Sequence, residues 1–217
     1  KVIRNRVIPA LLLENNSLVK TINFTKPSYI GDPINTVRIF NELLVDELMI
    51  LNINLDYQKI SIDFDLLKNI ASECFIPLSY GGGIKSVKEA ERIFRLGFEK
   101  IVINSFSFSN KDLLKELIKN FGGQSIIHSI DIKKKLLNPC SIYIESGTKR
   151  INVKLFEWLT YIEEIGVGEL LITNIDKEGT WNGFDYELVK KISNLMSIPV
   201  IAHGGCGNLE DIKKIFK

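Results

Sequence analysis

The sequence repeats itself. Residues 45–94 align without a gap on residues 167–216, so that VDELMILNIN lies over VGELLITNID and IPLSYGGG over IPVIAHGG. In each copy a short apolar run stops in polar residues or glycine, which is typical of a strand buried on both faces that reaches a loop. Two like halves that alternate strand and helix predict a closed (βα)₈ barrel, built from duplicated half-barrels, over an open sheet.

The expected elements follow this alternation along the chain. Strands are predicted at 7–13, 48–53, 76–80, 100–104, 125–132, 170–175 and 198–203. Helices are predicted at 33–44, 63–73, after Ser86, at 113–121, around Trp158, at 186–196 and at 209–216. Residues 14–32 are expected to be a long polar connection, and 140–145 with 149–153 a small inserted hairpin. We expect one barrel domain over residues 1–217, with its eighth strand and helix missing from this sequence and present in the natural protein.

Composition excludes several classes of protein. The 217 residues are 45% apolar and 25% charged, with a net charge of +2, which is enough for a full core but gives no strong field for nucleic acid or a membrane surface. No apolar run approaches the roughly 18 residues of a membrane span, so a cytoplasmic protein is expected. Cys74, Cys140 and Cys206 are odd in number and widely spaced, which favours buried or incidental thiols over disulfides.

Glycines follow two equivalent strands of the halves. Gly81–Gly83 and Gly204–Gly205 stand at the expected carboxyl ends, beside Asn104–Ser105 and residues 176–180. Without side chains, backbone N–H groups can surround a phosphate, and two such sites predict a ligand with a phosphate at each end. The alternative is that these glycines only serve tight turns.

One carboxylate is placed for catalysis. Asp131 ends the expected fifth strand, where a partly desolvated acid can act as general acid or base, although it could instead be a cap or loop residue. The matching position in the first half is Leu12. His203 and Cys206 lack a third ligand, so we expect no metal site, and Trp181 is expected to be a rim aromatic.

Charges precede four of the expected strands at the opposite end of the barrel. They are Arg6, Glu47, Lys100 and Glu169. Such residues are ordinarily solvated or stabilising, but their alternating sign would also allow a ring of salt bridges over the barrel axis.

Taken together, these motifs resemble the cyclase subunit of imidazole glycerol phosphate synthase. The resemblance covers the whole chain through RVIPA at 6, GDP at 31, DEL at 46, IPLSYGGGI at 76, KIVINS at 100, ID at 130, GELLITNIDKEGT at 168 and IPVIAHGG at 198. It implies a barrel that pairs with a glutaminase subunit as a heterodimer. Ammonia from glutamine would pass up the barrel to a doubly phosphorylated substrate, which is cleaved and cyclised in histidine synthesis without metal or organic cofactor.

The resemblance also assigns roles to residues. It implies phosphate or substrate binding by Gly82, Asn104 and Ser105 on one side and by Asp176, Gly179 and Gly205 on the other, with Lys20 contacting substrate from the first loop. It makes Asp131 one of two catalytic aspartates, and it makes Arg6, Glu47, Lys100 and Glu169 the gate through which ammonia enters.

This sequence departs from the family pattern at the other catalytic aspartate, which falls on Leu12. The following loop lacks the family's Asp-Gly turn, Asn52 replaces a strand-two aspartate, and His203 replaces a small serine. The contrast with the complete gate favours a diverged subunit that supplies ammonia for amide or amidine formation on a surface-polysaccharide sugar, with a sugar amidotransferase as acceptor. The alternatives are a working cyclase in which Asp131 and Glu14 share the chemistry, and a non-catalytic activator of a glutaminase.

Overall fold

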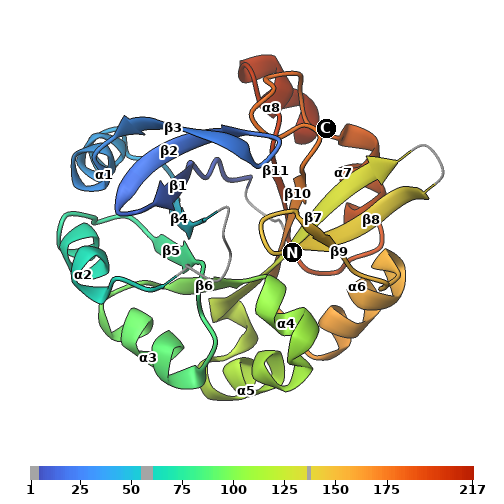
Figure 1. Cartoon of the computed structure of the whole chain (residues 1–217), viewed down its shortest axis with the longest axis horizontal. Helices are drawn as coiled ribbons and strands as arrows, with labels where there is room; N and C mark the ends of the chain where they lie inside the picture. The colour runs from blue at the N-terminus through green and yellow to red at the C-terminus, as the bar shows by residue number, and fades with distance from the viewer. Residues whose placement is uncertain (1–4, 55–60, 136–137) are drawn as a thin grey trace.

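The computed structural model describes residues 5–54, 61–135 and 138–217, and its centre is a ring of parallel strands. Each of these strands pairs with the next in the order β11-β10-β7-β6-β5-β4-β1. Their bounds are β1 Ala10–Glu14, β4 Leu48–Asn52, β5 Leu78–Gly81, β6 Lys100–Ile103, β7 Ile126–Lys135, β10 Glu169–Asn174 and β11 Val200–His203. Figure 1 shows the ring enclosed by helices, which confirms the predicted α/β barrel architecture.

Helices connect the strands on the outside of the ring. They are α1 Pro33–Glu42, α2 Phe64–Ser72, α3 Val87–Arg95, α4 Ser105–Ser109, α5 Lys111–Phe121, α6 Leu155–Glu164, α7 Tyr186–Ser193 and α8 Leu209–Ile215. The starts of α1, α2 and α3 are fixed by the side chains of Asp32, Asp63 and Ser86, which accept hydrogen bonds from first-turn amides. None of the described helices is long and apolar enough to span a bilayer.

The long polar connection predicted over residues 14–32 contains two strands that the prediction did not include. That segment forms the antiparallel hairpin of β2, Ser17–Ile22, and β3, Thr25–Gly31, and β2 pairs with the end of β1. Asn15 and Asn16 make the β1–β2 turn with positive φ, a conformation that asparagine tolerates well. The polar composition concealed these strands because one face of the hairpin is solvated.

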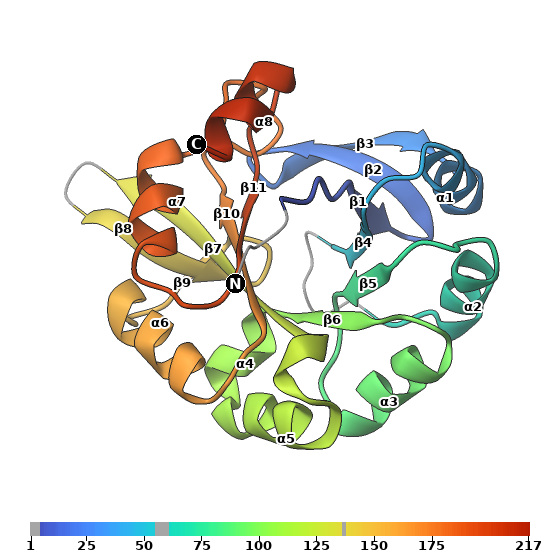
Figure 2. The ribbon, with the colours of Figure 1, turned by 180° about the vertical axis from the view of Figure 1, so that it is seen from behind.

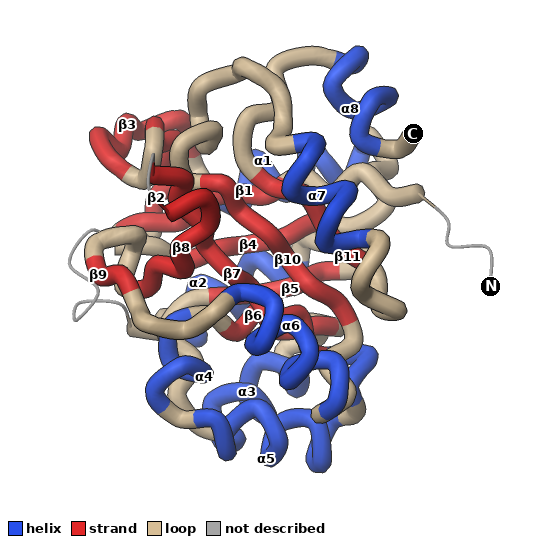
Figure 3. Tube along the Cα trace, turned by 90° about the vertical axis from the view of Figure 1, so that its right-hand side faces the viewer, coloured by secondary structure: helices blue, strands red, loops and turns tan. Residues whose placement is uncertain are grey.

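The inserted hairpin predicted at 140–145 and 149–153 is confirmed, and it makes one further pairing. β8 spans Asn138–Ile144 and pairs with β9, Lys149–Arg150, but it also pairs with the far end of β7. Lys133 and Lys134 therefore belong to β7, which continues beyond the predicted strand end at residue 132. Figure 3 shows that the β2–β3 and β8–β9 hairpins lie at the same end of the barrel.

The core has an inner and an outer part. Inside the ring, Met49, Val102, Ile127 and Leu171 pack with Ile8, Ala10, Leu51 and Ile201. Outside it, larger apolar clusters fill the space between strands and helices. Among the described residues β11 pairs only with β10, so the ring is open between β11 and β1, as Figure 2 shows from behind. A groove of about 1010 Å³ runs through this opening.

Candidate functional site

The four charges predicted at the amino ends of the strands meet in one cluster. Lys100 Nζ lies 3.1 Å from Glu47 Oε2 and 2.8 Å from Glu169 Oε1, and Arg6 contacts the same two carboxylates, at 3.0 Å to Glu169. Each cation thus bridges both acids. The side chains retain only 11–21% of their exposure, so this charge ring closes the lower end of the barrel with mutually compensated charges.

Above the ring the inward-facing positions change character with height. Strands alternate their faces, so Glu169, Leu171 and Thr173 of β10 point inward in succession, as do Lys100 and Val102 of β6. The sequence of layers is charge, aliphatic core and then polar groups at the carboxyl ends. At about 3.3 Å per residue, Thr173 lies roughly 13 Å farther along β10 than Glu169 of the charge ring.

Asp131 is the acid of the upper layer. It is 6% exposed, and Asn104 Nδ2 donates a hydrogen bond to its Oδ2 at 2.7 Å. Burial raises the pKa of this carboxyl to about 7, although hydrogen bonding from Asn104 and Thr173 acts in the opposite direction. A carboxyl that titrates near neutrality can exchange a proton with a ligand at physiological pH.

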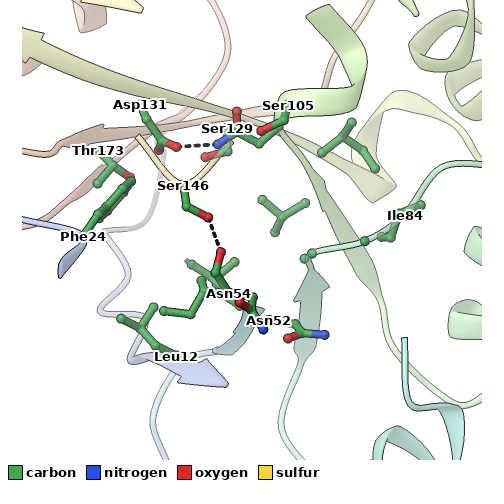
Figure 4. Close-up of a pocket in the computed structure, with 18 of the residues that line it drawn as sticks. Leu12, Phe24, Asn52, Asn54, Ile84, Ser105, Ser129, Asp131, Ser146 and Thr173 are labelled. Carbon is green, nitrogen blue, oxygen red and sulfur yellow. Dashed lines mark hydrogen bonds between the residues drawn. The ribbon is translucent and has the colours of Figure 1, made fainter. Parts of the chain in front are cut away.

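Asp131 lines a small cavity at the carboxyl ends of the strands. Its volume is about 140 Å³, and Leu12, Leu51, Ile53, Val102 and Ile84 make much of its wall apolar. Figure 4 shows Leu12 and Asp131 on different sides of this cavity. Leu12 offers no exchangeable proton. Asp131 is the only carboxylate among the described residues that line the cavity.

The first group of predicted phosphate residues gathers at this cavity. Gly82, Asn104 and Ser105 all line it. A Cβ at Gly82 would lie 2.1 Å from the Asn52 carbonyl oxygen, so close backbone packing is sufficient to require this glycine. The Ser105 hydroxyl accepts a hydrogen bond from the Glu145 amide at 3.0 Å. The tip of the β8–β9 hairpin is therefore hydrogen-bonded to Ser105, one of the residues predicted to bind phosphate.

The second group lies mostly elsewhere. Gly179, Gly205 and Lys20 line the groove between β1 and β11, and a Cβ at Gly179 would lie 2.0 Å from the Thr21 carbonyl oxygen. Lys20 Nζ sits 3.9 Å from the ring centroid of Trp181, a cation–π contact on an exposed indole. Asp176 is exposed, lines neither cavity, and accepts from the Lys134 amide at 2.8 Å.

The two hairpins hold residues over the cavity of Asp131. Ser146 Oγ donates to the Asn54 carbonyl at 2.6 Å, which joins the β8–β9 turn to the end of β4 (Figure 4). Buried Glu178 accepts from Thr21 Oγ1 at 2.8 Å and from the Phe24 amide at 2.9 Å. These contacts place Phe24 and Ser146 in the cavity wall.

His203 and Cys206 do not converge on a common point. His203 Nδ1 lies 3.1 Å from Thr173 Oγ1, and the exposed Cys206 thiol faces the Asn208 carbonyl. Among the described residues no group of three or more His, Cys, Asp or Glu side chains could hold a metal ion.

Sequence reasoning missed the polar neighbours of Asp131. Thr173 stands beside Asp131 in the β7–β10 register and beside His203 in the β10–β11 register, so the three side chains form a row across adjacent strands. Ser129 belongs to the same cavity. The sequence did carry one signal: Ser129 and Asp131 lie two residues apart on β7, so their side chains point to the same face of the strand.

A parallel ring with a cavity at the carboxyl ends of its strands defines a barrel of the (βα)₈ class. The family described as "Histidine biosynthesis protein" matches residues 6–217, and the chain belongs to this family. Within it, the chain is 43% identical over 215 residues to a provisionally named imidazole glycerol phosphate synthase subunit hisF2 of Pseudomonas aeruginosa, covering 99% of this chain and 86% of that protein.

Other relatives carry related names. The chain is 36% identical to imidazole glycerol phosphate synthase subunit HisF of Lactococcus lactis subsp. lactis, covering 98% of this chain and 82% of that protein. It is 33% identical to the subunit HisF of Streptococcus mutans, over 99% of this chain and 86% of that protein. The chain is thus a HisF-like protein, and its counterparts in the family are the cyclase subunits.

Proposed function

We propose that this chain is the ammonia-accepting subunit of a glutamine amidotransferase complex, and that it delivers ammonia for amide or amidine formation on a surface-polysaccharide sugar. In this complex a glutaminase subunit docks at the lower end of the barrel, and the charge ring of Arg6, Glu47, Lys100 and Glu169 is the gate. The observation that carries the proposal is Leu12, an apolar residue that faces the cavity of Asp131 while the gate residues remain fully paired.

The size and charge of the cavity support this reading. Small-molecule sites usually measure about 300–1,000 Å³, whereas this cavity has about 140 Å³ and no Lys or Arg among its described lining residues. A phosphate in this cavity would bring strong negative charge next to Asp131, and Lys20, the predicted substrate contact, lines the groove between β1 and β11 instead. Ammonia, which is small and uncharged, meets neither obstacle.

The lower face supports a protein partner. Leu43, Leu44 and Phe75 lie in the loops that precede β4 and β5, and they are 66%, 81% and 84% exposed. The Phe75 amide donates to Asn41 Oδ1 at 2.9 Å, which joins the Phe75 loop to the end of α1, from which the loop of Leu43 and Leu44 continues. Large exposed apolar side chains on adjoining loops are typical of a protein interface. They lie at the end of the barrel that carries the charge ring.

The working-cyclase alternative requires a second acid beside Asp131. Glu14 ends β1, but it lines neither the cavity of Asp131 nor the groove between β1 and β11. Loss of a positioned general acid or base ordinarily costs about 10²–10⁴-fold in rate. We therefore expect histidine-pathway turnover to be lower than an ordinary enzyme rate by at least that factor.

The experiment reconstitutes the chain with a glutaminase subunit. Three readouts are compared: glutamine hydrolysis, transfer of glutamine nitrogen to a sugar in the presence of the sugar amidotransferase, and release of aminoimidazole carboxamide ribonucleotide from the formimino substrate with ammonium salt. We expect stimulated hydrolysis and sugar amidation without ribonucleotide release. Ribonucleotide release at about 1–10 per second would instead establish the cyclase, and stimulation that survives Asp131→Asn without any transfer would establish a mere activator.

A further inference from the structure

A row of three polar side chains crosses adjacent strands at the carboxyl end of the barrel. Thr173 of β10 stands between Asp131 of β7 and His203 of β11, since it pairs with each of them in the strand register. The Thr173 hydroxyl lies 3.1 Å from His203 Nδ1 and also hydrogen-bonds to the Asp131 carboxyl. A hydroxyl has a single proton, so Thr173 donates to one neighbour and accepts from the other. The hydrogen bonds of the row therefore run in one direction.

The protonation state of Asp131 sets this direction. An ionised carboxylate can only accept, so Thr173 then donates to it, His203 Nδ1–H donates to Thr173, and Nε2 keeps a lone pair. When Asp131 is protonated, its proton lies on Oδ1, because Asn104 Nδ2 already donates to Oδ2 at 2.7 Å. The carboxyl can then donate to Thr173, and Thr173 to Nδ1, which moves the imidazole proton to Nε2. Ionisation of Asp131 is thus coupled to the tautomer of His203.

The other nitrogen of His203 is available to a ligand. His203 points into the ring, as Ile201 does two residues earlier on β11. Nε2 forms no hydrogen bond with the described residues. Of the described residues, only Leu12 and His203 line both the cavity of Asp131 and the groove between β1 and β11. The imidazole therefore stands at the junction of the two spaces, beside a residue that can neither give nor take a proton.

The charges around the ring favour a neutral imidazole. His203 faces Asp131 across Thr173 and Glu178 in the loop after β10, and Lys20 lines the same groove. Burial lowers the pKa of His203, although the charge of Glu178 acts in the opposite direction. Burial raises the pKa of Asp131 to about 7. Near neutrality the carboxyl, and not the imidazole, therefore takes up or releases the proton of the row.

We propose that Asp131, Thr173 and His203 form a proton relay, in which His203 Nε2 is a second acid–base group and exchanges protons with a ligand that carries an N–H or O–H at the junction of cavity and groove. In the acid direction Asp131 gives its proton to Thr173 Oγ1, Thr173 gives its own to His203 Nδ1, and Nε2 releases its proton to the ligand. One proton leaves the carboxyl and one reaches the ligand, while the imidazole changes tautomer without becoming charged. The reverse sequence takes a proton from the ligand.

The test follows the ring ¹⁵N resonances of the two histidines of the chain through a pH titration across pH 7. The two tautomers of a neutral imidazole differ in their nitrogen shifts, and His203→Gln identifies the signals of His203. As Asp131 ionises, the ratio of Nδ1–H to Nε2–H in His203 is expected to rise about ten-fold or more, because the wrong tautomer sets two donors or two acceptors against each other. His128 is the internal control, since Trp158 holds it in the Nδ1–H form. A tautomer ratio of His203 that is the same above and below pH 7 would overturn the relay.

Variants test each link of the row. In Asp131→Asn the amide oxygen can accept from Asn104 while the amide nitrogen donates to Thr173, so His203 should keep the Nε2–H form at every pH. Thr173→Val removes the shared hydroxyl and should abolish the change of tautomer, whereas Thr160→Val, the same exchange on the exposed face of α6, should leave it intact. If Thr173→Val does not fold, Asp131→Asn still decides. A tautomer change near pH 7 that persists in Asp131→Asn or in Thr173→Val would refute the coupling.

Chemical reactivity tests whether Nε2 is available as a base. Diethylpyrocarbonate transfers its carbethoxyl group to an unprotonated imidazole nitrogen, and mass spectrometry locates the modified residue. The rate at His203 is expected to rise several-fold as Asp131 ionises near pH 7 and to stay low in Asp131→Asn, whereas the fully buried His128 should not react. A rate at His203 that is flat across pH 7, or equal in the wild type and Asp131→Asn, would exclude Nε2 as the acid–base group.

The relay goes beyond the proposed function, and its measurements need neither a glutaminase nor a sugar. Sugar amidation by a chain in which His203 does not change tautomer would remove the relay and leave the delivery of ammonia intact. A tautomer change in a chain that fails to support amidation would establish the relay and refute the delivery.

Discussion

His128 makes an acid-sensitive link in the wall of the barrel. It lies on β7 with no exposed surface, Nδ1 lies 3.0 Å from the Ile103 carbonyl, and Nε2 lies 2.8 Å from Trp158 Nε1. The indole N–H can only donate, so Nε2 must accept and Nδ1 must carry the single proton. Protonation would set two N–H groups against each other in a fully buried site, and burial lowers the pKa of His128 to about 4.

This shift predicts how stability depends on pH. The folded pKa of about 4 lies below the unfolded value of about 6.5, so the unfolded state binds the proton first as the pH falls. The contribution is fully present above pH 6.5 and is lost progressively down to pH 4. At 1.36 kcal/mol per pKa unit, the loss amounts to about 3 kcal/mol of unfolding free energy.

The assay is urea unfolding of the wild type and His128→Gln at several pH values between 7.5 and 4.5. Glutamine keeps one donor and one acceptor but does not titrate, so the stability advantage of the wild type should shrink by about 2–3 kcal/mol across this range. Trp158→Phe removes the donor that excludes the second proton, and its pH slope should be shallower than that of the wild type. A wild-type advantage that stays constant with pH would refute the reasoning.

Three further predictions concern other groups. Asp131→Asn should stabilise the fold by up to about 4 kcal/mol above pH 7, and this gain should vanish by pH 4. The reason is that the folded pKa of Asp131, about 7, exceeds the unfolded value, so ionising the buried carboxyl costs stability as the pH rises. Urea titrations that give the same gain at both pH values would contradict the buried ionisation. Gly179→Ala should lower the stability measured by thermal unfolding by about 3 kcal/mol, against about 1 kcal/mol for Gly166→Ala. Both glycines have positive φ, but only Gly179 abuts a carbonyl oxygen. Equal costs would show that close packing is not what requires glycine at position 179. Lys100→Met should destabilise the fold by about 3 kcal/mol because it leaves Glu47 and Glu169 with one shared cation. The control Lys213→Met, at an exposed position, should change the stability by no more than about 0.5 kcal/mol. Similar chemical-denaturation midpoints for the two variants would show that the charge ring is solvated.

Much of the fold could be read from periodicity. The apolar runs at 48–53 and 170–175 match β4 and β10 closely, since a strand buried on both faces needs nearly continuous apolar residues. The caps Asp32 and Ser86 were equally readable, because capping depends on a few adjacent residues. The β2–β3 hairpin was not, because a half-solvated hairpin of mixed polarity carries no local sign of the strand against which it pairs.

The candidate site divides along the same line. Gly82, Asn104, Ser105 and Asp131 could be placed together from their positions after strands, because parallel strands bring their carboxyl ends to one edge. The hydrogen bond of Asn104 to Asp131 could not be read, nor could the contact of Lys20 with Trp181 in a separate groove. Both depend on side-chain directions at residues far apart in the sequence.

The sequence by itself determined the alternation of strands and helices, the four charges that precede strands and the apolar residue at position 12. Each of these follows from residue type and position along the chain. Only the tertiary structure decided that the cavity is small and apolar, that Asp131 titrates near neutrality and that Asn104 keeps an acceptor without a donor. Volume, desolvation and hydrogen-bond satisfaction are properties of atoms brought together from several strands, and they exist only when the ring has formed.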